Sequence, residues 1–183
     1  MRSRLQQQSN IRQVFKWNFP TVKATEMCLT ISYDVEVQAR GGETVFNPFL
    51  CDVLHQIAEY LYDPKEKWGL WLCGMPGNGK TTAVKAIIDE TIVMDNKVIC
   101  FYTAKELCSM YVEDFDSFQR MKKYPYLVID DMGNEPTEVM NYGSIATPVI
   151  DLLEYRYSSQ LFTIVTTNLP SQGNGSISRK YGA

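Results

Sequence analysis

The clearest chemistry in the sequence lies in eight consecutive residues that match the pattern G-x-x-x-x-G-K-[ST] throughout. A loop of this kind wraps an anion with backbone N–H groups, and its glycines allow the close approach and unusual dihedral angles that this requires. The helix that follows presents its positive N-terminal end to the same anion. The pattern therefore predicts a phosphate site for a nucleotide, ATP or ADP. The predicted binding residues are Gly74, Met75, Pro76, Gly77, Asn78, Gly79, Lys80, Thr81 and the adjoining Thr82.

Two side chains of this loop have predicted roles of their own. The Lys80 ammonium would reach the β- and γ-phosphates, and the Thr81 hydroxyl would ligate Mg²⁺. A glycine-rich turn that arose by chance is the alternative. The context favours the nucleotide site, because the loop follows an apolar strand-like run and opens a helical stretch.

A second element combines four apolar residues with two acids, in the segment 126–131. Acids at the carboxyl end of a buried strand are typical of a Walker B strand, where ligands of open α/β sheets bind. Asp130 is predicted to hold Mg²⁺, and Asp131 to orient or deprotonate the attacking water. The alternative is a pair of solvated turn acids before Gly133.

A third polar group follows the next predicted strand. Asn168 comes directly after Thr167 and just before Leu169-Pro170. An amide at that strand end could hydrogen-bond the γ-phosphate or the lytic water. The alternative is an asparagine that serves a turn before proline.

Apolar runs that alternate with helical stretches must position these residues. Strands are predicted at 69–74, 97–103, 126–130 and 161–168, and helices at 80–94, from 104, and around 145–153, the last either kinked at Thr147-Pro148 or starting there. This alternation predicts an α/β fold, a parallel sheet with helices on both faces and strands buried on both sides.

Residues 1–46 differ from the rest. They begin with a basic arm that carries Arg2, Arg4, Arg12, Lys16 and Lys23 and no acid, and we interpret them as a segment that could bind a partner. A solvated tail is the alternative. The segment 31–46 alternates in part and contains Gly41-Gly42, which predicts a β-hairpin. Asn47-Pro48 then predicts the start of a helix that ends near Asp63-Pro64, and of the ATPase core at 47–183.

Length, charge and cysteine content exclude some classes of protein. The length of 183 residues fits one domain with an extension, and no apolar run or secretory signal indicates a membrane protein, so we expect the cytoplasm. The net charge of −3 argues against bulk coating of nucleic acid but allows a local patch. The five cysteines form no C-x-x-C pair, and Cys73 and Cys100 are expected to be buried, inert thiols.

The motifs GMPGNGKTT, FYTAKEL, YLVIDDMGNE, LLEYRY and IVTTNLP occur in this order. With them, residues 50–183 resemble the AAA+ ATPase core of DnaC/DnaI-type helicase loaders, of which the transposition ATPase IstB is a relative. The resemblance implies a P-loop NTPase sheet ordered 5-1-4-3-2. It implies catalytic roles for Lys80 and Asp131, with Asn168 as sensor 1. It also matches Glu135 to the acid of that group after the Walker B strand, although an exposed turn residue is the alternative.

Partners follow only from the resemblance. It implies a replicative helicase, single-stranded DNA and self-association through the ATP sites. The sequence ends at Ala183, before the segments in which such loaders carry a fifth strand, an arginine finger and a helical lid. We therefore expect a C-terminally incomplete core with slow ATP hydrolysis in the isolated chain. An IstB-like transposition regulator, a nucleotide-gated adaptor that hardly hydrolyses ATP and, more weakly, a small-molecule kinase remain open.

Overall fold

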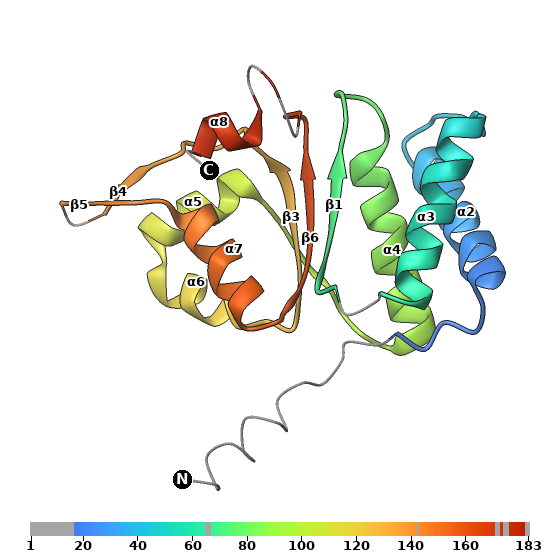
Figure 1. Ribbon diagram of the computed structural model, residues 1–183, viewed down its shortest axis with the longest axis horizontal. Coiled ribbons are helices and arrows are strands. Elements are labelled where there is room, and N and C mark those ends of the chain that lie inside the picture. Colours follow the sequence, from blue (N-terminus) through green and yellow to red (C-terminus); the bar gives the residue numbers. More distant parts are fainter. Residues whose placement is uncertain (1–16, 65–66, 142, 171–172, 174–175, 182–183) are drawn as a thin grey trace, which may run out of the picture.

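Four parallel strands form the central sheet of the computed structural model, which describes residues 17–64, 67–141, 143–170, 173 and 176–181 (Figure 1). Their order across the sheet is β1-β6-β3-β2. This is the predicted order without its fifth strand, because β6 inserts between β1 and β3. The strands are β1 (Gly69–Cys73), β2 (Cys100–Thr103), β3 (Tyr126–Met132) and β6 (Phe162–Thr167).

Helices cover both faces of this sheet, as expected for an α/β fold (Figure 1). On one face α3 (Pro48–Tyr62) and α4 (Lys80–Asp95) pack in a core with Val128 and Ile164, and α2 (Val22–Gln38) lies against both helices. On the other face α5 (Ala104–Glu113), α6 (Phe115–Met121) and α7 (Pro148–Ser158) pack against Leu127, Ile129 and Val165. Neighbouring residues of β3 thus enter opposite cores, because successive strand side chains point to opposite faces.

Local signals account for several boundaries. Asn47 accepts a hydrogen bond from Leu50 N at 2.9 Å, which caps α3 as the Asn-Pro pair predicts. At α5, Thr103 and Glu106 form a reciprocal capping box. Both caps satisfy backbone N–H groups that the first helical turn leaves without partners.

The predicted β-hairpin at 31–46 is wrong, because the first half of this segment, residues 31–38, belongs to helix α2. Thr21 caps the helix at Ala24 N, and Thr25, Leu29 and Tyr33 recur at helical spacing as its buried residues. Packing of this face against α3 and α4 outweighs the strand propensity of a segment rich in β-branched residues. Gly41, at φ +77°, ends the helix in a left-handed conformation and makes no hairpin turn.

Two other details differ from the prediction. The strand β1 lies at the edge of the sheet and is only partly buried, so Cys73 is exposed rather than buried. Ile145 is not helical but lies on β5 (Ser144–Ala146), which pairs with β4 (Val139–Asn141) in a ribbon that projects from the body (Figure 1). The following helix, α7, begins only at Pro148.

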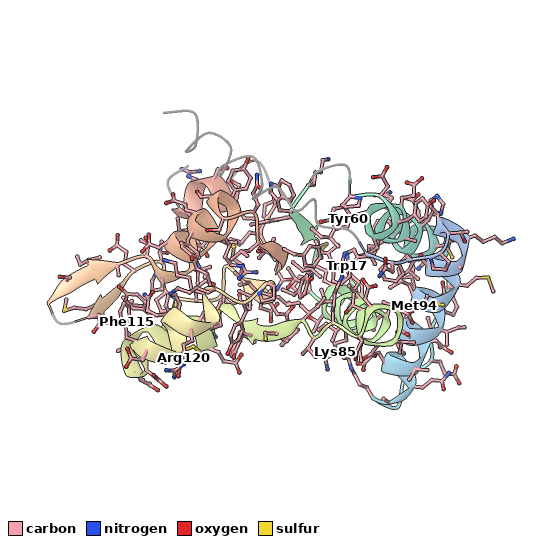
Figure 2. The ribbon with its side chains drawn as sticks, turned by 90° about the horizontal axis from the view of Figure 1, so that it is seen from below. Trp17, Tyr60, Lys85, Met94, Phe115 and Arg120 are labelled. Carbon is pink, nitrogen blue, oxygen red and sulfur yellow. The ribbon has the colours of Figure 1, made fainter. Side chains whose placement is uncertain are left out.

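Trp17, the first described residue, is part of the core beside the sheet (Figure 2). Its ring lies 5.2 Å from that of Tyr126 and 5.3 Å from that of Phe162, between ring centroids. Residues 17–38 therefore share one hydrophobic core with the predicted ATPase segment. Arg2, Arg4, Arg12 and Lys16 of the basic arm lie outside the described residues. Within the described part of the chain, no helix is long and apolar enough to cross a membrane.

Candidate functional site

The glycine-rich loop joins the end of β1 to the start of α4, as its spacing predicts. Gly77 and Gly79 have φ of +83° and +76°, which residues with a side chain rarely adopt. The Lys80 ammonium folds over the loop and donates to the carbonyl oxygens of Gly74 and Met75, each at 2.9 Å. The loop thus places a cation and the positive end of α4 beside one another.

Asp130 lies across from this loop at the end of β3. The Thr81 hydroxyl donates to its carboxylate, with both oxygens at 3.1 Å, although the two residues are 49 positions apart in the sequence. Asp130 is 4% exposed and also accepts from the Thr166 hydroxyl. The two residues predicted to hold Mg²⁺ therefore lie within hydrogen-bonding distance of one another.

Asp131 adopts a left-handed conformation, with φ of +55°, immediately after the buried Asp130. Its backbone N–H donates to Thr166 Oγ1 at 2.9 Å, and the pairing of β3 with β6 shifts register between Ile129 and Met132. Residues with side chains enter this conformation at a cost, and such strain is often found at functional sites. The turn directs the two adjacent acids differently, so that Asp130 is buried and Asp131 is half-buried.

The predicted third polar group, Asn168, follows the last residue of β6 and is half-buried. It lies beside the Asp131 turn because Thr167 pairs with Met132 and donates its hydroxyl to the Met132 carbonyl at 2.6 Å. Leu169 packs so closely on Gly133 that a Cβ there would meet Leu169 Cδ1 at 2.7 Å. The ends of β1, β3 and β6 thus bring all the predicted site residues to one edge of the sheet.

Glu135 is not an exposed turn residue, since only 3% of it is accessible. Its carboxylate accepts from Gly133 N at 2.7 Å and from the Tyr181 hydroxyl. Lys180 donates to the carbonyl oxygens of Gly133 and Glu135. These contacts fasten α8 (Ile177–Tyr181) to the loop after β3, and burial raises the pKa of the Tyr181 hydroxyl, with Glu135 adding to the shift.

A cavity of about 590 Å³ adjoins the glycine-rich loop, between β1 and the helices α2 and α3. Its walls combine apolar side chains with a few polar groups, as small-molecule sites do. Residues in its lining include Tyr33, Asn47, Phe49, Trp71, Asn78 and Lys80. The cavity is open to the loop that would hold phosphates, so the rest of a nucleotide has room there.

Thr166 and the α2 side of the cavity were not among the predicted site residues. A signal for Thr166 existed, because the expected strand order places 161–168 beside the strand that carries Asp130. For Tyr33 there was none, since its segment was predicted as a hairpin.

Comparison with known proteins identifies the family of this chain. Residues 70–169, which contain the loop, Asp130 and Asn168, match the family model described as RNA helicase. The chain belongs to this family. No curated protein sequence matches the chain significantly.

Solved structures resemble this RNA helicase family member over about three quarters of its length. The DnaC helicase loader is 25% identical with a TM-score of 0.56, and the match covers 74% of this chain and 78% of that one. DnaI is 22% identical at the same TM-score, with 75% and 76% covered. AMPPCP-bound DnaA from Aquifex aeolicus is 18% identical with a TM-score of 0.53, covering 76% of this chain and 46% of DnaA.

These matches confirm the expected resemblance to DnaC/DnaI-type AAA+ proteins and the P-loop fold.

Proposed function

We propose that this chain binds ATP with Mg²⁺ and hydrolyses it. The observation that carries the proposal is the pairing of Thr81 with the buried Asp130 at 3.1 Å, beside the glycine-rich loop. A hydroxyl and a carboxylate are the hard oxygen ligands that Mg²⁺ accepts, and the ion commonly takes few protein ligands together with phosphate oxygens and water. When bound, Mg²⁺ would neutralise charge that develops on the phosphates.

The other site residues then have distinct roles. Lys80 binds phosphate oxygens in place of the loop carbonyls that it contacts here. Asp131 orients the attacking water and takes its proton, because its carboxylate lies at the strand end without the burial of Asp130. Asn168, on the neighbouring strand end, hydrogen-bonds the γ-phosphate or that water.

At the level of the cell, we infer an AAA+ helicase loader that acts in DNA replication. The similarity to the DnaC helicase loader supports this role, because it extends over most of both chains. The proposed partners are a replicative helicase, single-stranded DNA and further copies of the chain that associate through their ATP sites. Since the net charge is −3, DNA binding by one subunit should be local, weak and sensitive to salt.

Fluorescence anisotropy with labelled oligonucleotides tests this role. Single-stranded DNA, duplex DNA and single-stranded RNA are titrated with and without a non-hydrolysable ATP analogue, and Lys80→Ala serves as the matched control. We expect single-stranded DNA to bind best, more tightly with the analogue, and the gain to vanish in Lys80→Ala. Repeated weak sites on one strand gain from effective concentration when nucleotide aligns subunits.

The family description favours RNA as a second candidate ligand, which is why the RNA arm is included. Preference for RNA would replace the loader by an RNA-directed ATPase. Preference for duplex DNA regardless of nucleotide would favour the transposition regulator. Binding of nucleotide without any nucleic acid would favour the adaptor.

A further inference from the structure

Helix α2, which precedes the region matched by the family model, reaches the phosphate loop through Tyr33. This side chain is 7% exposed and lines the cavity beside the loop together with Gly79 and Lys80. Its hydroxyl occupies the space that a side chain on Gly79 would need, because a Cβ there would lie 2.0 Å from Tyr33 Oη. A phenol on α2 is therefore packed directly against the start of α4.

The Tyr33 hydroxyl makes no hydrogen bond with any residue that the structure describes. Although most of the side chain is buried, the hydroxyl oxygen is accessible from the cavity, where water or a ligand can accept its hydrogen. Burial raises the pKa of this hydroxyl, which the nearby Arg40 opposes, so the group stays protonated and able to donate at neutral pH. A donor that opens onto a cavity beside a phosphate loop is suited to an oxygen of a ligand.

Arg40, just beyond the end of α2, approaches the same place. Its guanidinium donates to Thr82 Oγ1 at 3.2 Å, in the first turn of α4. The carboxylate oxygen Oε2 of Glu36 lies 3.0 Å from the guanidinium of Arg40 and 3.8 Å from Lys85 Nζ, so Glu36 helps to hold Arg40 in place. The α2 segment thus adds a cation at the helix end where the phosphate is expected to bind.

We propose that α2 completes the nucleotide site: the Tyr33 hydroxyl donates to a phosphate or ribose oxygen, and Arg40 adds positive charge beside Thr82. The inference rests on the proposed nucleotide binding. It adds two ligand-contacting residues that lie outside the matched region 70–169. One consequence is that nucleotide binding and the docking of α2 stabilise one another, because the ligand then contacts both.

Calorimetry with ADP and with pyrophosphate tests the Tyr33 contact. Tyr33→Phe should weaken ADP binding about two- to tenfold, the effect of one lost hydrogen bond. The matched control is Tyr60→Phe, whose hydroxyl donates to the Lys67 carbonyl at 3.3 Å and lies outside the cavity. Weaker pyrophosphate binding in Tyr33→Phe identifies a phosphate oxygen as acceptor, and unchanged pyrophosphate binding identifies the ribose.

Thermal unfolding without nucleotide separates a ligand contact from a structural one. Since the hydroxyl has no partner among the described residues, Tyr33→Phe should melt at the wild-type temperature and lose only part of the ADP-induced shift. Arg40→Gln should weaken pyrophosphate binding about two- to fivefold, as expected for an exposed charge. Arg120→Gln, whose guanidinium contacts Ser117 on α6, should have no effect.

The results separate this inference from the proposed function. Wild-type protein that binds neither ADP nor pyrophosphate would overturn both. Wild-type binding with equal affinity in Tyr33→Phe and Arg40→Gln would overturn the role of α2 alone. A Tyr33→Phe variant that melts earlier but binds ADP normally would show that the hydroxyl serves the fold.

Discussion

Thr166 donates its hydroxyl hydrogen to the carboxylate of Asp130 across 2.5 Å, from the neighbouring strand. The same oxygen accepts the backbone N–H of Asp131 at 2.9 Å. One buried hydroxyl therefore holds both acids of the candidate site, the first through its side chain and the second through its backbone.

Replacing Thr166 by valine should loosen this arrangement at almost constant volume. It leaves the Asp131 N–H without its partner and takes from Asp130 Oδ1 one of the two hydroxyls that donate to it, at a cost of about 1–3 kcal/mol of unfolding free energy. Urea unfolding without nucleotide measures this loss, and Thr166→Ser, which keeps the hydroxyl, should recover most of it. Equal stability of the valine variant and the wild type would mean that the hydroxyl does not support the two acids.

Removing the Lys80 ammonium should weaken nucleotide binding. A charge-assisted hydrogen bond to phosphate contributes about 1.5–3 kcal/mol, so Lys80→Ala should bind Mg·ATP and Mg·ADP correspondingly more weakly in calorimetry. Lys85→Ala is the control, because Lys85 lies on the same helix and contacts Glu36. Equal affinity in Lys80→Ala and the wild type would remove the basis of the nucleotide site.

Substitutions of Asp130 and Asp131 should affect nucleotide binding and turnover differently. Asp131→Asn keeps the shape but removes the basic carboxylate, so it should bind ATP normally and lose hydrolysis. Asp130→Asn should instead shift the Mg²⁺ concentration that binding and turnover require. Phosphate release across a Mg²⁺ titration measures both effects. Turnover of Asp131→Asn at the wild-type rate would mean that another residue orients the attacking water.

Arg156 should be important for the stability of the fold. It is fully buried, and it donates to the carbonyls of Lys122, Tyr124 and Phe162 and to the Thr163 hydroxyl. Burial lowers its pKa to about 10, so it remains cationic at neutral pH.

Replacement of Arg156 by lysine keeps the charge but not the planar fork that reaches four acceptors. Several buried acceptors then lose a donor, and Arg156→Lys should cost about 2–4 kcal/mol of unfolding free energy in urea. Arg120→Lys is the control, because Arg120 is exposed. A loss no larger than that of the control would show that other groups satisfy these carbonyls.

The link between α2 and α3 through His55 predicts a pH dependence. The hydrogen bond of His55 Nδ1 with Glu26, 2.8 Å long, raises the pKa of the imidazole from 6.5. Burial opposes this shift, and the charges of Glu26, Glu59 and Asp52 add to it. The folded state therefore binds this proton more tightly than the unfolded state. The stabilisation is complete below pH 6.5 and is lost as the pH rises through the raised pKa.

Unfolding free energies measured between pH 5.5 and 8.5 should thus carry a decline that His55→Gln removes. His55 is the single histidine of the chain, so the difference between the two profiles isolates its contribution. An identical profile in the wild type and His55→Gln would show that Glu26 does not hold the proton in the folded state.

Those parts of the site that contiguous residues build could be predicted from the sequence alone. The run from Gly74 to Thr82 predicts its own loop, because backbone conformation there depends on glycine and on the helix that starts at Lys80. Two other features could likewise be predicted, since each combines a local pattern with a terminal residue. They are the apolar strand followed by Asp130 and the Asn-Pro start of α3.

The other parts of the site depend on how distant segments pack. The segment 31–46 alternates enough to predict a β-hairpin, yet its first half is helical because Leu29 and Tyr33 bury this helix against α3 and α4, which no local pattern reveals. The same packing brings Tyr33 to Gly79, 46 positions later in the sequence. The pairing of β6 with β3 brings Thr166 to Asp130. Contacts of this kind depend on which elements become neighbours, and that is determined by burial of whole faces rather than by the residues of one segment.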